Sequence, residues 1–271
     1  MQTSINQDKA QNNSRSSGRN HNSKSPLRYP GGKTRAVNSI LPYFPDKPGI
    51  LVSPFFGGGS VELAAAKLGW KVLGYDRYQP LVDFWQTVLT DPAILADAVM
   101  DYYPLSRAEF YRLQQQESLT TQLAEATRYF VLNRCSFSGT TMSGGMSPGH
   151  DRFTQSAIDR LRTFHVGKLW VEQADFARSI ALNRNAFLYL DPPYYSASGL
   201  YGRRGDLHEG FHHAGLRKLL KNRDRWVLSY DDCLEVREMY SGYKIVELNW
   251  KYGMSSDKKS REILILSREA L

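Results

Sequence analysis

The sequence of 271 residues is poor in cysteine and has no long apolar run. Its two cysteines, Cys135 and Cys233, lie far apart and form no CxxC pair, so they indicate neither a disulfide framework nor a cysteine-bound zinc ion. No apolar run approaches the ~18 residues of a membrane span, and residues 1–25 lack the apolar core of a signal peptide. We therefore expect a soluble cytoplasmic protein with no membrane partner.

Two features that could suggest a nucleotide or a metal ion lack the spacing that either ligand needs. Residues 32–34 (GKT) resemble the end of a P-loop, but that motif requires a glycine where Leu27 stands and a strand before it. Three histidines lie close together without HExxH or a comparable ligand spacing, namely His208, His212 and His213. We expect neither a nucleoside triphosphate nor a metal ion.

The chain is basic, with a formal net charge of +8 and a pI near 9.4. A positive excess of this kind favours a polyanionic partner, although many basic proteins have none. Residues 1–25 are rich in Asn, Ser and Gln and have almost nothing to bury, so we expect a disordered tail. The remainder, in a chain with 41% hydrophobic residues, is long enough to form a substantial core.

The first recognisable unit of the folded part is a strand, a glycine turn and a helix. Residues 49–53 (GILVS) are typical of a strand, residues 54–59 (PFFGGG) of a tight turn, and residues 60–66 (SVELAAA) of a helix. This order predicts the first βα unit of a Rossmann-like sheet. Glu62 stands where a pyrophosphate-binding fingerprint has its third glycine, which disfavours a dinucleotide.

A second strand, residues 71–75, ends in Asp76 a short distance after the glycine turn. A carboxylate in this place can accept hydrogen bonds from both hydroxyls of a ribose. A cofactor with a ribose and no phosphates, such as S-adenosylmethionine, agrees with both features. We assign Phe56, Gly57 and Gly59 of the turn to the cofactor site, because glycines let a backbone approach a ligand closely.

A third strand, residues 169–172, leads to another acidic residue followed by an aromatic one, Asp175 and Phe176. Phe176 offers a face for an adenine ring, and the Asp175 carboxylate can accept from the amino group of that ring. We therefore predict that this pair binds the adenine of the cofactor.

The motif Asp191-Pro192-Pro193-Tyr194, called the 191–194 motif below, follows a short apolar run at residues 186–190. That run is typical of a buried strand, and open α/β sheets bind ligands at strand ends of this kind. The prolines have no N–H and fix φ, which leaves the Asp191 carboxylate and nearby carbonyls as acceptors beside the Tyr194 ring. Such a cluster suits a planar amine. The alternative is a simple turn after a strand.

Residues 80–168 change to helical periods and predict an inserted, mainly helical subdomain. Six cationic residues outweigh two aspartates within residues 127–170, which indicates either a polyanion-binding surface or a solvated basic face. Residues 137–150 are rich in Gly and Ser and suggest a hairpin that reaches into a groove. Residues 195–213 suggest a mobile loop over the site. We assign five residues to polyanion contacts: Arg134, Ser138, Arg152, Arg203 and Arg204.

Five segments in this order resemble the motif set of the Dam-like (alpha) class of DNA adenine N6-methyltransferases. They are residues 27–33 (LRYPGGK), 54–60 (PFFGGGS), 133–134 (NR), the 191–194 motif (DPPY) and 228–231 (LSYD). The resemblance spans roughly residues 26–267 and is far more specific than any single motif. It implies an α/β fold: a Rossmann-like, S-adenosylmethionine-dependent methyltransferase sheet of seven strands ending in an antiparallel hairpin, with an inserted target-recognition subdomain. We therefore expect a catalytic domain of residues 26–79 and 169–271 and an insertion of residues 80–168.

The resemblance also implies roles for individual residues. Six fall on cofactor-contact positions of the family: Tyr29, Lys33, Asp76, Asp175, Phe176 and Asp191. Three fall on its target-adenine positions: Asp191, Pro192 and Tyr194. Tyr29 replaces a tryptophan common in the family, and residues 138–153 differ from the recognition hairpin of members that methylate GATC.

We therefore expect an enzyme that transfers a methyl group from S-adenosylmethionine to N6 of a flipped adenine in double-stranded DNA. It would act as a monomer, without a metal ion, in the cytoplasm at the nucleoid. Methylation of an RNA adenine or of a protein glutamine is the nearest alternative, and the basic insertion favours DNA over both. A catalytically silent DNA-binding relative would be expected to have lost Asp191 or Asp76, and both are present.

Overall fold

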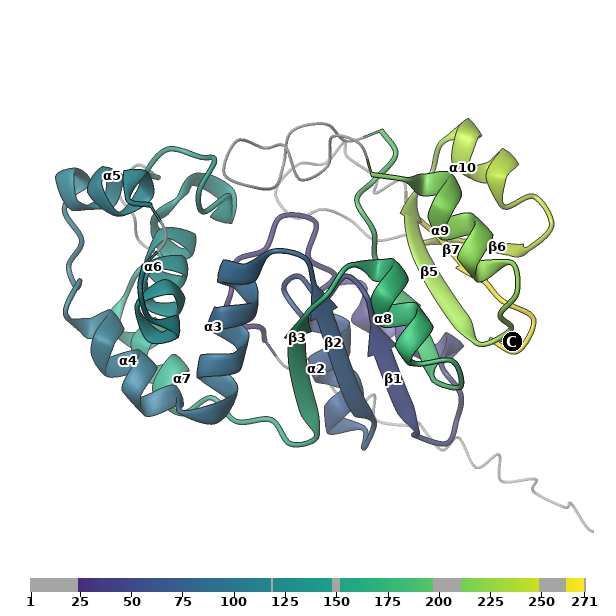
Figure 1. The fold of residues 1–271 in the computed structure, drawn as a ribbon, viewed down its shortest axis with the longest axis horizontal. Helices are drawn as coiled ribbons and strands as arrows, with labels where there is room; N and C mark the ends of the chain where they lie inside the picture. The colour runs from purple at the N-terminus through teal and green to yellow at the C-terminus, as the bar shows by residue number, and fades with distance from the viewer. Residues whose placement is uncertain (1–23, 118, 148–151, 197–210, 249–261, 271) are drawn as a thin grey trace, which may run out of the picture.

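A seven-stranded sheet forms the centre of the protein in the computed structural model, which describes residues 24–117, 119–147, 152–196, 211–248 and 262–270 (Figure 1). The strand order is β3-β2-β1-β4-β5-β7-β6, and β7 runs in the opposite direction to the other described strands. The strands are β1 Ile50–Ser53, β2 Lys71–Asp76, β3 Leu169–Gln173, β4 Phe187–Leu190, β5 Trp226–Asp231, β6 Lys244–Leu248 and β7 Glu262–Leu266. The predicted Rossmann-like sheet with its antiparallel β6–β7 pair is confirmed.

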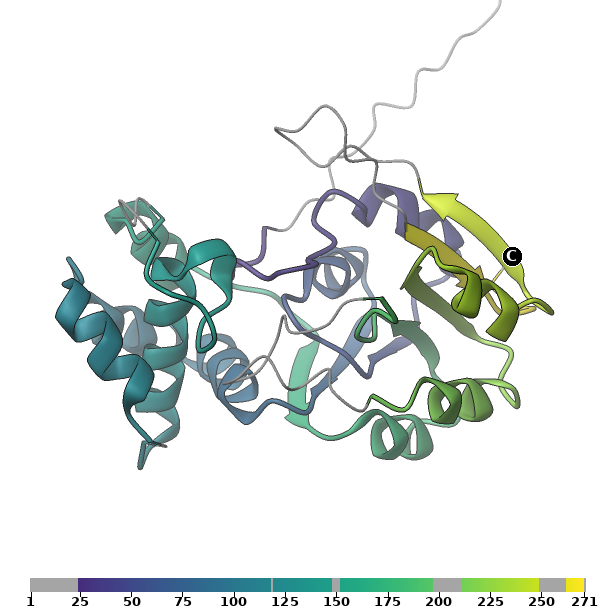
Figure 2. The same ribbon diagram turned by 90° about the horizontal axis from the view of Figure 1, so that it is seen from above.

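Helices cover both faces of the sheet (Figure 2). On one face lie α1 Val37–Ile40, the 3-10 helix η1 Leu41–Tyr43 and α2 Ser60–Lys67. On the other lie α8 Phe176–Leu182, α9 His213–Leu220 and α10 Leu234–Met239. Alternate strand residues enter the two cores, because successive side chains point to opposite faces. In β4, for example, Phe187 and Tyr189 join one core while Leu188 and Leu190 join the other.

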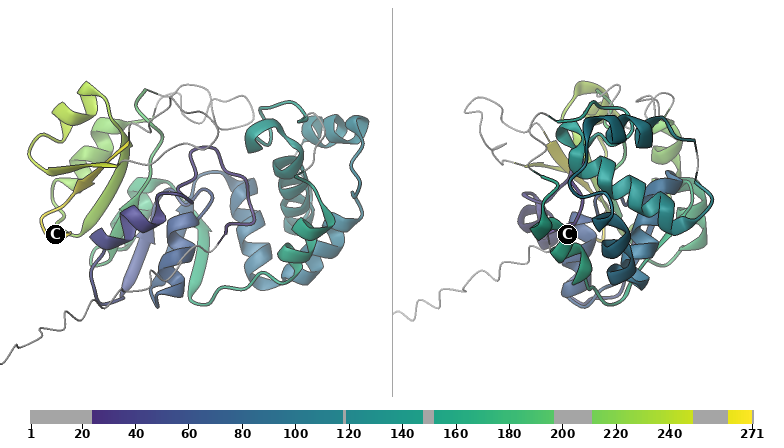
Figure 3. Two further views of the ribbon diagram at one scale, coloured as in Figure 1. Left: turned by 180° about the vertical axis from the view of Figure 1, so that it is seen from behind. Right: turned by 90° about the vertical axis from the view of Figure 1, so that its left-hand side faces the viewer.

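The segment between β2 and β3 is helical and lies beside the β3 edge of the sheet (Figure 3). It contains α3 Gln79–Thr90, α4 Pro92–Met100, α5 Arg107–Gln115, α6 Gln122–Cys135, the 3-10 turn η2 Phe137–Gly139 and α7 Gln155–Arg162. Helix α3 packs against both β3 and α6, so one core continues from the sheet into the helices. The domain boundary at residue 80 stays a prediction, because α3 serves both parts.

Capping residues set where these inserted helices begin. Asp91, Ser106, Thr121 and Thr154 precede α4, α5, α6 and α7, and each side chain accepts a hydrogen bond from the backbone N–H three residues later. Those N–H groups have no partner inside the helix, so each cap stabilises its helix by about 1 kcal/mol. Among the helices that the structure describes, none is long and apolar enough to cross a membrane.

Candidate active site

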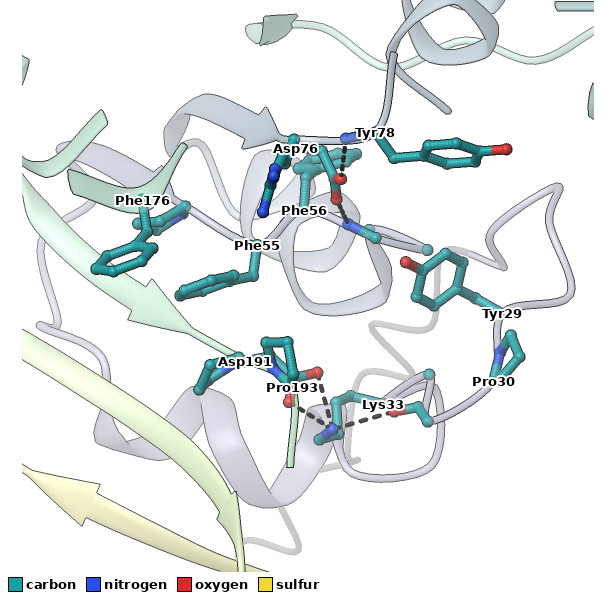
Figure 4. Close-up of a pocket in the computed structure, with 18 of the residues that line it drawn as sticks. Tyr29, Pro30, Lys33, Phe55, Phe56, Asp76, Tyr78, Phe176, Asp191 and Pro193 are labelled. Carbon is teal, nitrogen blue, oxygen red and sulfur yellow. Dashed lines mark hydrogen bonds and ion pairs between the residues drawn. The ribbon is translucent and has the colours of Figure 1, made fainter. Parts of the chain in front are cut away.

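A pocket of about 520 Å³ opens where β1, β2 and β4 end (Figure 4). Residues from the N-terminal segment, the glycine turn, the 191–194 motif and the inserted subdomain line it together. Among them are Tyr29, Lys33, Asp76, Phe176, Asp191 and Tyr194. The structure therefore brings together segments that the sequence analysis had assigned separately to a cofactor and to a planar amine.

The glycine turn closes around Tyr29. Gly57 has a left-handed backbone (φ 48°), and a Cβ on it would lie 2.8 Å from the Tyr29 ring. A Cβ on Gly58 would lie 2.6 Å from the Cβ of Tyr29. The absence of side chains at Gly57 and Gly58 thus leaves room for Tyr29 at the edge of the pocket. The close approach of Gly57 and Gly59 to a cofactor stays a prediction.

Phe56 lines the pocket, and its ring packs into the core. The side chain is 2% exposed and packs edge-to-face on Trp85, with ring centroids 5.1 Å apart. A Cβ on Gly74 would lie 2.2 Å from this ring, so β2 needs a glycine there to make room for it. The ring of Phe56 thus supports the glycine turn, and contact of this residue with a cofactor stays a prediction.

Asp76 ends β2 and ties the glycine turn to the start of α3. One carboxylate oxygen accepts from the N–H of Gly57 and the other from the N–H of Tyr78, each at 3.0 Å. Burial raises the pKa of Asp76, and these backbone donors oppose the rise. Each carboxylate oxygen has a second lone pair, so the two oxygens can also accept from ribose hydroxyls.

Aromatic rings form one wall of the pocket around Phe176. Its ring stacks on Phe55, with centroids 5.8 Å apart and planes 25° apart, and packs against Phe211 at 5.3 Å. Asp175 caps α8 by accepting from the N–H of Arg178 at 2.8 Å. The sequence analysis missed Phe55 and Phe211. The position of Phe55 beside the glycine turn was a signal for the first, whereas no local pattern marked the second.

Lys33 is the direct partner of Asp191. Its Nζ lies 2.7 and 2.8 Å from the two carboxylate oxygens, and it also donates to the Tyr194 hydroxyl at 2.8 Å. Lys33 is 5% exposed. Burial raises the pKa of Asp191, and the Lys33 charge opposes this rise. Lys33 thus binds the acid and the tyrosine of the 191–194 motif, and its contact with the cofactor stays a prediction.

Two further carboxylates lie close to this ion pair. Glu262 of β7 has an oxygen 3.8 Å from Lys33 Nζ. Glu62 of α2 accepts a hydrogen bond from Ser53 Oγ at 2.7 Å, and burial raises its pKa to about 7, with Asp191 contributing to the rise. The position of Glu62 in the sequence indicated only that a dinucleotide is disfavoured, and no local pattern marked Glu262 as part of the site. Asp191 and Glu262 thus lie within 4 Å of Lys33, and Glu62 is close enough for its pKa to respond to Asp191. Repulsion among these carboxylates favours a proton on one of them.

A group of arginines lies at the end of α6. Arg134 donates to the backbone carbonyl of Arg152 at 2.8 Å, and Arg28 donates to the carbonyl of Ser136 at 3.2 Å. Burial lowers the pKa of Arg134 to about 10, and the charges of Arg28, Arg160 and Arg152 add to this effect. The four guanidinium groups therefore form one local concentration of positive charge.

The described part of the loop after α6 makes the short turn η2 and folds back through an antiparallel bridge between Ser136 and Met146. The hairpin over residues 137–150 stays a prediction. Ser138 is exposed with φ 53°, and residues 148–150 lie outside the described part of the chain. Residues 1–23 of the expected tail and 197–210 of the expected loop, including Arg203 and Arg204, also lie outside it.

Comparison with known proteins agrees with this geometry. The family model for D12 class N6 adenine-specific DNA methyltransferases matches residues 29–254. The chain is 30% identical over 204 residues to the modification methylase StsI of Streptococcus sanguinis, a match that covers 67% of this chain and 30% of that relative. It is 24% identical over 268 residues to a DNA adenine methylase of Haemophilus influenzae, covering 87% of this chain and 89% of the relative. The chain belongs to the D12 class of N6 adenine-specific DNA methyltransferases.

Proposed function

We propose that this protein transfers a methyl group from S-adenosylmethionine to N6 of an adenine flipped out of double-stranded DNA. The observation that carries the proposal is the position of the Lys33–Asp191 ion pair in the same pocket as the glycine turn and Asp76. One pocket thus combines acceptors for an amine with acceptors for a ribose.

The residues of the pocket suit the cofactor. The volume of about 520 Å³ is in the range typical of small-molecule sites. Asp76 would accept from the ribose hydroxyls, the Phe176 wall would contact the adenine, and Asp175 lies beside that wall with one carboxylate oxygen on a backbone N–H. S-adenosylmethionine, when bound, supplies an electrophilic methyl group on a sulfonium.

The 191–194 motif would prepare the target amine. Adenine N6 is a weak nucleophile because its lone pair is delocalised into the ring. Asp191 and the carbonyl of Pro192 would accept hydrogen bonds from its two N–H groups. These bonds would localise the lone pair on N6 and direct it at the methyl group. The charge of Lys33 favours the ionised form of Asp191, because it opposes the rise in pKa that burial causes. The amine would use the lone pairs of Asp191 that Lys33 leaves.

A target base inside a duplex cannot reach this pocket, so it must be flipped out. The Tyr194 ring would then stack on the flipped adenine in place of its lost neighbours. The arginine group at the end of α6 would bind phosphates, which makes binding dependent on salt. The monomeric state and the location at the nucleoid stay predictions.

A transfer assay with labelled S-adenosylmethionine tests the proposal. The enzyme is incubated with duplex DNA, total RNA and total protein in separate reactions. We expect label in DNA, on adenine. Label confined to RNA or to protein would support the alternative substrates, and absence of label in all three would support a catalytically silent relative.

A further inference from the structure

Asp231 ends β5 beside the 191–194 motif, because β4 and β5 are parallel neighbours in the sheet. Its carboxylate accepts three hydrogen bonds from the two residues that follow Tyr194. Tyr195 N–H binds one oxygen at 2.8 Å, and Ser196 binds the other through its N–H at 2.9 Å and its hydroxyl at 2.5 Å. Asp231 is 7% exposed, whereas Tyr195 and Ser196 are exposed, so the buried carboxylate holds a segment at the surface.

We infer that Asp231 is a positioning residue for the transfer reaction: it fixes the peptide that follows Tyr194 and so sets the orientation of the Tyr194 ring. The inference rests on the proposed function. Asp231 is the last residue of the 228–231 segment, one of the five segments that resemble the family, and the inference gives this residue a role.

The contact is a long-range clamp and not a local turn. Asp231 lies 36 residues after Tyr195 and 35 after Ser196 in sequence, so it joins the ends of two strands. A carboxylate that accepts backbone N–H groups makes charge-assisted bonds, about twice as strong as neutral ones. The clamp therefore holds the chain at the point where it leaves the 191–194 motif.

The clamp acts on Tyr194 because the bound N–H of Tyr195 belongs to the peptide plane that begins at the Tyr194 carbonyl. Tyr194 is held at its other end by Lys33, which donates to its hydroxyl at 2.8 Å. The two prolines before it have fixed φ angles. With the backbone fixed on both sides and the hydroxyl fixed by Lys33, the ring has one orientation for stacking on a planar base.

An asparagine cannot replace Asp231 in this role. Donors approach both carboxylate oxygens, so an amide in either orientation would direct its NH2 group at an N–H. Asp231→Asn would therefore break at least one bond while it keeps the size of the side chain. Ser196→Ala would remove only the hydroxyl contact and leave both backbone bonds in place.

The test measures single-turnover methylation of a duplex together with binding. We expect Asp231→Asn to lower the transfer rate by roughly tenfold to a hundredfold, because small misplacements of reacting groups have effects of this size. Ser196→Ala should lower it less. The dissociation constants for S-adenosylmethionine and for the duplex should stay within about twofold of wild type in both variants.

A matched control is Asp91→Asn, which removes the charge of an aspartate that caps α4 away from the pocket. It should leave the transfer rate unchanged. A second readout is the fluorescence of 2-aminopurine at the target position of the duplex, which stacking quenches. Enhanced emission from the complex with Asp231→Asn, relative to wild type, is expected if Tyr194 stacks less well.

Two results would overturn the inference alone: an active wild type with an equally active Asp231→Asn, or a variant whose rate falls only in step with its cofactor affinity and melting temperature. The latter would show a merely structural role. An inactive wild type on DNA would overturn the proposed function first, so the two failures can be distinguished.

Discussion

Lys33 Nζ lies 2.7 and 2.8 Å from the two oxygens of Asp191, which makes the lysine the main electrostatic neighbour of the proposed catalytic acid. Burial raises the pKa of Asp191 and the lysine opposes that rise. The proposed reaction needs the ionised acid, because only a carboxylate accepts both from Lys33 and from the amine. The charge of Lys33 thus favours the form of Asp191 that the proposed reaction needs.

Lys33→Met should therefore move the acid limb of the rate profile to higher pH. Without the lysine, burial is unopposed, the pKa of Asp191 rises further, and a larger fraction of the enzyme is protonated at a given pH. Single-turnover rates measured across pH 5 to 9 would show the shift. Lys71→Met is the control, since Lys71 lies over the exposed Trp170. An acid limb in the same place for Lys33→Met and wild type would contradict the prediction.

Glu62 should make folding stability depend on pH. Its pKa rises from 4.5 to about 7 on folding, so the native state favours the protonated form. Stability from this group is present below the unfolded pKa and is lost as pH rises toward 7, by on the order of 3 kcal/mol in total. Glu62→Gln keeps an acceptor for Ser53 and should flatten this dependence. Urea unfolding at pH 5 and pH 8 measures the change in the free energy of unfolding between the two pH values. An equal change in wild type and Glu62→Gln would show that Glu62 does not cause the dependence.

Gly58→Ala should displace Tyr29 and weaken the cofactor site. The new Cβ would lie 2.6 Å from the Cβ of Tyr29, and overpacking of this kind costs about 1–3 kcal/mol. Calorimetric titration with S-adenosylmethionine and a thermal melt would record both effects. Gly242→Ala is the matched control, because its Cβ would meet nothing within 4 Å. Unchanged cofactor affinity in Gly58→Ala would show that Tyr29 does not shape the site.

Arg134→Ala should weaken duplex binding about equally for all sequences. If Arg134 contacts a phosphate, its loss lowers the slope of log affinity against log salt by about 1. Arg225→Ala provides the comparison, since Arg225 is half exposed and pairs with Glu269 at 3.5 Å beside the start of β5. The prediction fails if Arg134→Ala and Arg225→Ala have the same salt slope.

The parts of the site that follow local sequence rules were predicted correctly in position. The glycine turn, Asp76 and the 191–194 motif each stand next to a strand with a clear apolar pattern, and they meet in one pocket because parallel strands end at one edge of the sheet. Phe56 also lines this pocket, but the packing of its ring on Trp85 could not be predicted from the local pattern.

The remaining features depend on residues that are distant in sequence. Lys33 and Asp191 are 158 residues apart in sequence. The Asp231 clamp joins the chain after β4 to the end of β5, 36 residues later. Glu262 reaches Lys33 only because β7 lies beside β5 in the sheet. Contacts of this kind follow from the sheet order, which no local pattern specifies. The position of the loop after α6 depends on such contacts too, since Asn133 of α6 bonds the backbone of both Arg28 and Gly139.

The most direct measurement is nucleoside analysis of duplex DNA after incubation with S-adenosylmethionine and either the wild-type enzyme or Asp191→Ala. We predict N6-methyldeoxyadenosine with the wild type, and none with Asp191→Ala although that variant still binds the duplex. Equal amounts of N6-methyldeoxyadenosine from both proteins, or a methylated base other than adenine from the wild type, would contradict the proposed function.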